Sequence, residues 1–263
     1  MSARDTMPED GGSHVAATTP AERTFPVGRA LLGRAAVVVW NDIADAGRKQ
    51  FYDWHDREHV PERLAIPGFR RGRRYARAGH SPEWLTLYEA DDLDALTSPS
   101  YLARLNAPTP LTTRTLVHFR NTSRAIAGVV CSLGASTGGH VLAMRLDVPL
   151  AGTGAMCAHV SEVAFPRAMA QGGVVACHLL AGDAAASQRK TTESAARTFD
   201  VPSWVVLVEA TRADAAADAL ALLDDDALRA TGATVAAGAA VYALEICRLA
   251  GPADDAAPRT TEH

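Results

Sequence analysis

Short apolar runs alternate along the first half of this chain with segments of helical spacing. Residues 35–43 form a mainly apolar run with three adjacent valines, which is typical of a buried β-strand. Residues 48–64 carry apolar and aromatic side chains near helical spacing, and Pro67 and Gly68 end that helix. Strands are predicted next at 69–77, 84–90 and 115–126, with a helix at 93–105. The predicted order is β-α-β-β-α-β.

The second half of the chain repeats this pattern. The segment Pro-Glu-Trp-Leu-Thr-Leu-Tyr-Glu-Ala at 82–90 returns at 202–210 as Pro-Ser-Trp-Val-Val-Leu-Val-Glu-Ala. Upstream, Pro61 and Gly68 stand at the same spacing as Pro166 and Gly173, so a duplicated unit is predicted. Its strands are expected at 141–148, 174–180, 204–210 and 240–249, and its helices at 160–170 and 213–223. A polar insertion at 183–200 is predicted to be a long hairpin loop.

The β-α-β-β-α-β order is the ferredoxin-like motif, in which two helices cover one face of an antiparallel sheet. The other face also needs cover, and the second sheet can supply it. We therefore predict an α+β fold of two tandem ferredoxin-like units packed sheet to sheet as an α+β barrel within one chain. The expected parts are a mobile tail at 1–32, unit 1 at 33–127, a linker at 128–139, unit 2 at 140–250 and a mobile tail at 251–263.

Composition excludes several classes of protein. The chain is 48% hydrophobic and 21% charged, as in an ordinary globular protein. Its net charge of −4 and the confinement of its clustered arginines to one strand argue against nucleic-acid binding. No apolar run reaches the roughly 20 residues of a membrane span. The start lacks a secretory signal, and the four cysteines are widely spaced, so a cytoplasmic protein with reduced thiols is expected.

One segment resembles a known family. Residues 51–63 read Phe-Tyr-Asp-Trp-His-Asp-Arg-Glu-His-Val-Pro-Glu-Arg, and 66–69 read Ile-Pro-Gly-Phe. They resemble the first helix and second strand of dimeric α+β barrel proteins, EthD-like members in particular. The resemblance covers about residues 33–250 as architecture, but its motif covers the first half alone, because Val160 and Ala164 replace the two histidines in the second half.

The resemblance implies a small-molecule enzyme that uses cofactor-independent acid/base chemistry. Isomerase, cyclase, decarboxylase and monooxygenase reactions on an aromatic or polyketide-like acid all fit it. Haem-binding relatives exist in the superfamily, but no residue here stands out as an axial ligand, and no cofactor is expected. The alternative is a non-catalytic ligand-binding or interaction protein, and a homodimer is compatible with either.

His55 and His59 are the predicted catalytic residues. Four positions apart on a helix, they share a face, and histidine titrates near the operating pH. His59 is the preferred acid or base. Two alternatives stay open: both rings face solvent, or His59 interacts with the dipole at the helix end. The stretch His-Asp-Arg-Glu-His also fits a short zinc-protease pattern, but no third ligand is identifiable, and no metal is expected.

The arginine-rich strand at 69–77 is the second candidate feature. Arg73 and Tyr75 alternate onto one of its faces, and a buried arginine would need a partner such as Glu89. The simpler alternative is an exposed or edge strand that discourages aggregation, with Glu89 in solvent. His178 stands where the first half has Arg73 and could share its layer. The predicted substrate-binding residues, suited to a flat carboxylate or phenolic compound, are Arg73, Tyr75, Trp54, Trp40 and Glu89.

Overall fold

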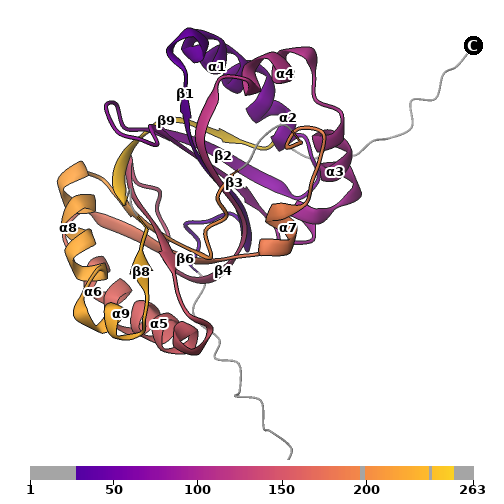
Figure 1. The fold of residues 1–263 in the computed structure, drawn as a ribbon. Helices are drawn as coiled ribbons and strands as arrows, with labels where there is room; N and C mark the ends of the chain where they lie inside the picture. Colours follow the sequence, from indigo (N-terminus) through magenta and orange to yellow (C-terminus); the bar gives the residue numbers. More distant parts are fainter. Residues whose placement is uncertain (1–27, 196–198, 237–238, 252–263) are drawn as a thin grey trace, which may run out of the picture.

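Eight antiparallel strands form a closed barrel with helices on its outside (Figure 1). The computed structural model describes residues 28–195, 199–236 and 239–251. Around the ring the order is β7-β6-β4-β1-β3-β2-β9-β5, and pairing of β5 with β7 closes it. A ninth, short strand, β8 (Thr234–Val235), pairs with the last two residues of β5. The strands are β1 (Ala35–Ile43), β2 (Phe69–Ala76), β3 (Trp84–Ala90), β4 (Phe119–Gly134), β5 (His140–Asp147), β6 (Val174–Gly182), β7 (Trp204–Ala210) and β9 (Ala240–Leu249).

The two halves of the chain share one strand order. The first half contributes β4-β1-β3-β2, and the second contributes β9-β5-β7-β6. When the four strands of each half are counted along the chain, both halves have the order fourth, first, third, second. The halves join where β4 pairs with β6 and β2 pairs with β9. The predicted α+β barrel is therefore confirmed. Descent of the halves from one duplicated unit stays a prediction.

Helices cover the outer face of each half separately (Figure 1). Over the first half lie α1 (Arg48–Trp54), α2 (Val60–Leu64), α3 (Pro99–Asn106) and α4 (Pro110–Leu116). Over the second half lie α5 (Thr153–His159), α6 (Phe165–Met169), α8 (Ala213–Leu223) and α9 (Asp226–Ala230). Short 3-10 turns occupy Asp45–Gly47, Ala95–Thr97 and Leu150–Gly152. In the described ranges no helix is both long and apolar enough to cross a membrane.

Strand alternation divides the side chains between the barrel interior and the space beneath the helices. On β1, Val38 and Trp40 point inward, whereas Val37 packs under the helices. Inside, Trp40 and Tyr75 pack with strand residues from both halves. An eight-stranded barrel is narrow enough for side chains to fill it. The interior is thus a joint core of the two halves.

The first helix of each half contains a π turn at the same place. These turns span His55–His59 and Val160–Ala164, and a proline follows each of them, Pro61 and Pro166. Proline cannot donate a backbone hydrogen bond, and its ring conflicts with the carbonyl one turn earlier. The preceding turn widens accordingly, so that Val60 N–H bonds to His55 O. Only the first half places histidines on this widened turn.

Several predicted boundaries need correction. The strand predicted at 115–126 begins at Phe119, after α4, and the helix predicted at 160–170 begins at Thr153. Strand β4 continues to Gly134 and pairs with β6, so the first part of the predicted linker at 128–139 is strand. Its glycines and serines resemble loop composition, but the chain must stay extended there to reach the second sheet. Of the predicted tail at 1–32, residues 1–27 lie outside the described residues, while Ala30 and Leu31 are buried. Nearly all of the tail predicted at 251–263 also lies outside the described residues.

The insertion in the second half packs against the first half. Instead of a plain hairpin loop, it contains α7 (Ala184–Gln188), capped by the Asp183 carboxylate, which accepts from Ala186 N. Ser187 Oγ accepts a 2.8 Å hydrogen bond from Ile126 N on β4. Further along, Glu193 N donates to Leu105 O at the end of α3 over 3.0 Å. The insertion therefore reaches the helices that cover the first sheet.

Candidate functional site

A hollow lies between the outer face of β1 and β3 and the helices of the first half, and its room for water-sized molecules is about 70 Å³. Val37, Val39 and Thr86 form its floor on the strands. The helices and the insertion form its walls. Six aromatic residues line it, namely Phe51, Trp54, Tyr88, Tyr101, Phe119 and Phe199. Such a lining suits a flat, mainly apolar ligand.

His55 and His59 both line this hollow, so the alternative that they face solvent is wrong. Their residues are 3% and 9% exposed. Their ring centroids are 5.7 Å apart, and the His59 ring lies 4.2 Å from that of Trp54 in a tilted stack. Tyr88 stands edge-on to His59 at 6.0 Å. The π turn thus presents two imidazoles to one aromatic cavity.

His55 is held in one neutral tautomer by its neighbours. Its Nδ1 lies 3.1 Å from Arg74 Nη1, and because a guanidinium has no acceptor, Nδ1 must accept this hydrogen bond. The proton therefore sits on Nε2, which faces Tyr88 Oη at 3.4 Å. Burial, reinforced by the positive charge of Arg74, holds the pKa of His55 well below its ordinary value. His55 is neutral at physiological pH.

Tyr88 is left with a hydroxyl proton to donate. Its oxygen accepts from His55 Nε2, and burial raises its pKa far above the ordinary value, so the phenol stays protonated. A neutral phenol held by a neutral imidazole is a fixed hydrogen-bond donor at the cavity wall. The sequence analysis did not select Tyr88. Its position on β3, two residues after Thr86, could have shown that both side chains lie on the same face of the strand.

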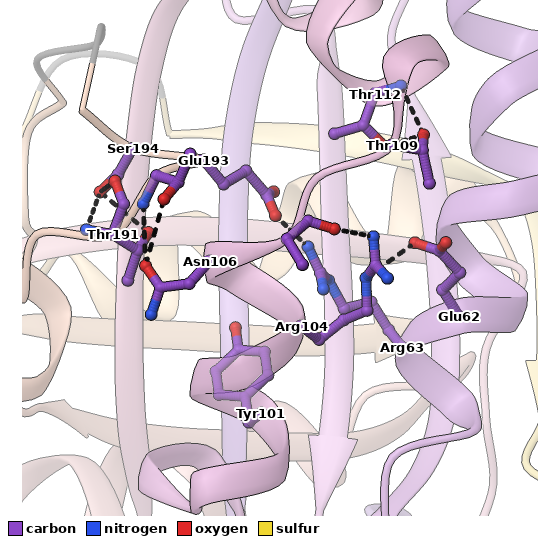
Figure 2. A network of polar contacts seen from close by, with 12 residues as sticks. Glu62, Arg63, Tyr101, Arg104, Asn106, Thr109, Thr112, Thr191, Glu193 and Ser194 are labelled. Atoms are coloured by element: carbon purple, nitrogen blue, oxygen red, sulfur yellow. Dashed lines mark hydrogen bonds and ion pairs between the residues drawn. The ribbon is translucent and has the colours of Figure 1, made fainter.

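The charged groups of the cavity were also missed. Among the described residues that line it, Arg63, Arg124 and Glu193 carry formal charges. Glu193 comes from the insertion and forms an ion pair with Arg63 (Figure 2). Arg124 donates to Tyr101 Oη at 3.1 Å. No local sequence pattern predicts that these residues line one cavity, because they come from segments that are distant in the sequence.

The other predicted substrate-binding residues lie elsewhere. Trp40 and Tyr75 are inside the barrel, and Arg73 is fully buried there with Glu89. Trp54 alone of that set lines the cavity with the histidines. The predicted common pocket is therefore divided by the sheet. Arg73 and Tyr75 do share a face of β2, but it is the face turned away from the helices.

Inside the barrel, Arg73 bridges the two halves. It contacts Glu89 and Glu209, each at 2.8 Å, and His178 Nε2 lies 3.2 Å from Glu209. Burial opposes ionisation of Glu209, but the hydrogen bond with His178 and the charge of Arg73 outweigh it and hold its pKa at about 2. The expected partnership of a buried arginine with Glu89 is confirmed, as is the shared layer with His178. The edge-strand alternative is wrong, since β2 lies between β3 and β9.

Two other motifs have no supporting geometry. No group of three or more potential metal ligands occurs in the part of the chain that the structure describes. Gly134–Gly138 read Gly-Ala-Ser-Thr-Gly, which fits the serine-hydrolase pattern Gly-x-Ser-x-Gly. That pattern requires a strand-to-helix elbow, whereas Ser136 is exposed on the connection between the antiparallel strands β4 and β5.

Solved structures share this fold. A protein described as anthrone oxidase-like matches with a TM-score of 0.58 and 13% identity, over 86% of this chain and 98% of that one. A candidate chlorite dismutase matches with a TM-score of 0.50 and 10% identity, over 82% and 96%. Both belong with antiparallel barrels of the dimeric α+β barrel type. No protein-family model and no curated protein matches the chain. The resemblance to EthD-like members stays a prediction.

Proposed function

We propose that this chain is a small-molecule enzyme that binds a flat phenolic or polyketide-like compound in the first-half cavity and removes a proton from it without a cofactor. The observation that carries the proposal is the placement of His59 beside a neutral His55–Tyr88 pair in an aromatic cavity. The second half has Val160 and Ala164 at the equivalent positions, both in an apolar core. One half therefore supplies the chemistry and the other serves as scaffold.

The geometry supports a division of roles. His59, stacked on Trp54, is the proton acceptor, since His55 already accepts from Arg74 at Nδ1 and donates at Nε2. Tyr88 donates a hydrogen bond to the substrate oxygen on which negative charge develops as an enolate forms. His55 is a positioning residue. Because its Nε2–H donates to Tyr88 Oη, the hydroxyl proton of Tyr88 points away from His55. Aromatic walls orient the ring system and exclude water.

An anthrone is a suitable substrate class to test, and the fold shared with an anthrone oxidase-like protein supports that choice. Its ring methylene is acidic, and its keto oxygen can accept from Tyr88. With molecular oxygen as co-substrate, the deprotonated methylene would be oxidised to a carbonyl with release of water: CH2 plus O2 gives C=O plus H2O. Removal of the proton is the step that we assign to these residues.

The test measures proton removal directly. The protein is mixed with 1,8-dihydroxyanthrone under nitrogen in heavy water, and NMR follows exchange of the methylene protons. We expect the protein to accelerate exchange and His59→Gln to lose about 100-fold of that acceleration, as for loss of a general base. His140→Gln, a change on the second-half strand β5 outside the cavity, is the matched control and should exchange as the parent does.

Two results would contradict the proposal. If His59→Gln and the parent exchange at the same rate, His59 is not the base. If the compound binds without any faster exchange, the protein is a non-catalytic binder of aromatic compounds. Thermal unfolding of each variant would show whether a loss of activity reflects loss of fold.

A further inference from the structure

The cavity contains a buried arginine that its surroundings satisfy only in part. Arg63 is on α2, lines the cavity, and has a side chain only 4% exposed. One of its terminal nitrogens donates to Glu193 Oε2, while Nη1 is buried without a hydrogen-bond partner among the described residues. Buried polar atoms are almost always hydrogen-bonded, so an unpartnered guanidinium nitrogen in a cavity wall needs an explanation.

The charge balance of the cavity also favours an anionic ligand. Within the part of the chain that the structure describes, Arg63 and Arg124 contribute two positive charges to the lining, and Glu193 contributes one negative charge. His55 is neutral, because burial and Arg74 hold its pKa well below the ordinary value. The described part of the lining therefore carries an excess of positive charge. An anionic ligand would remove both the charge excess and the missing hydrogen bond.

Glu193 reaches Arg63 on a polar segment held by few contacts. Thr192 N donates to Asn106 Oδ1 and Glu193 N donates to Leu105 O, each over 3.0 Å. Both acceptors are at the end of α3. Thr191 is the only residue of 191–195 that is buried. The Glu193 side chain is only 10% exposed and lines the cavity beside Arg63, so its carboxylate is close to any anion that binds Arg63.

We propose that Arg63 is the anion-binding residue of the cavity, taking a carboxylate of an aromatic ligand at Nη1, and that Glu193 limits the affinity of that site. This inference rests on the proposed function, whose cavity it uses. It names the substrate class as aromatic carboxylates. Glu193 acts by like-charge repulsion and by its share of the same guanidinium, so its neutralisation should favour anions over neutral ligands.

A matched pair of planar probes tests this, 2-naphthoate and its neutral amide, with binding measured by calorimetry near neutral pH. We expect the protein to prefer the carboxylate. The variant Glu193→Gln should bind the carboxylate about tenfold more tightly, which corresponds to about 1.4 kcal/mol of binding free energy. Its affinity for the amide should be unchanged. In Arg63→Gln the preference should disappear. Glu62→Gln is the control, because Glu62 pairs with Arg104 on the same side of the protein and does not line the cavity.

The outcomes separate this inference from the proposed function. If both probes bind and Glu193→Gln changes their affinities equally, the anion site is overturned while the aromatic cavity stands. The same follows if the amide binds and the carboxylate does not. If neither probe binds to the parent or to Glu193→Gln, both proposals are overturned. Glu193→Gln keeps the buried guanidinium in place, so the test does not depend on Arg63→Gln folding.

Discussion

Arg74 donates a hydrogen bond from Nη1 to Nδ1 of His55 over 3.1 Å, and this contact fixes the tautomer of that buried histidine. Arg74 is on β2, on the face opposite to Arg73, and it is itself held by Asp56 and Glu245. Because the guanidinium can only donate, it fixes both the tautomer of His55 and the direction in which Tyr88 donates. A residue on the strand therefore organises a pair on the helix and the next strand.

Substitution Arg74→Gln should raise the pKa of His55. The change removes a positive charge that lowers this pKa and leaves the nearby carboxylates of Asp56 and Glu245 uncompensated, while the amide can still donate to Nδ1. An NMR titration of the His55 ring protons measures the shift. Arg70→Gln, on the same strand but paired with Asp91 away from the site, should leave the titration unchanged. A downward shift in Arg74→Gln would contradict the effect assigned to the charge of Arg74.

His55 should also make stability depend on pH. Its folded pKa lies well below the value of about 6.5 expected for the unfolded chain. At pH values between these two pKa values, the unfolded state binds more protons than the folded state. The contribution of His55 to the free energy of unfolding is therefore complete above about pH 6.5 and is lost as the pH falls toward the folded pKa. The slope for this group approaches about 1.4 kcal/mol per pH unit. Denaturant unfolding across this range, with His55→Gln as comparison, should give a shallower slope for the variant.

The fold could be read from the sequence because its signals are local and repeated. Alternating apolar strands, the proline and glycine after the first helix, and the echo of 82–90 at 202–210 all appear in short windows. The strand β1 has the bounds that its apolar run predicts. The error at 128–134 arose because glycine and serine weaken a strand signal without preventing an extended chain. There, pairing with β6 decides the conformation.

The site could be predicted only in part, because its assembly depends on long-range contacts. Spacing showed that His55 and His59 share a helix face, but only packing shows that this face is buried. Alternation showed that Arg73 and Tyr75 share a strand face, but not that it points into the barrel. The contact of Glu193 with Arg63 joins positions far apart in the sequence. No periodic pattern encodes such a pairing.

Substitution Glu209→Gln should destabilise the barrel strongly. It removes one of the two carboxylates that hold the fully buried Arg73, and leaves that charge with Glu89 alone, which Arg71 already shares. Breaking a buried ion pair on one side costs about 3 to 5 kcal/mol. Denaturant unfolding measures the loss. Asp214→Asn, an equal charge change at an exposed ion pair with Arg212, is the control and should alter stability far less. Equal effects would show that the barrel network contributes little.

Substitution Pro61→Ala should impair the site by altering the π turn. Alanine can donate its backbone N–H to the carbonyl one turn earlier, so the widened turn at His55–His59 can revert to α-helical hydrogen bonding. That reversion would rotate the histidines relative to Trp54 and Tyr88. A misplacement of about 1 Å in such a site can cost about 100-fold in rate. The measurement is methylene exchange in 1,8-dihydroxyanthrone, as for His59→Gln.

The second half supplies an internal control for this change. Pro166 follows the π turn at Val160–Ala164 as Pro61 follows its own, and that turn carries no histidine. Pro166→Ala should therefore change the backbone in the same way while exchange proceeds at the parental rate. Equal loss of exchange in both variants would mean that the π turns act through the stability of the barrel. If methylene exchange is lost in Pro61→Ala alone, the widened turn is needed to place His55 and His59 in the cavity.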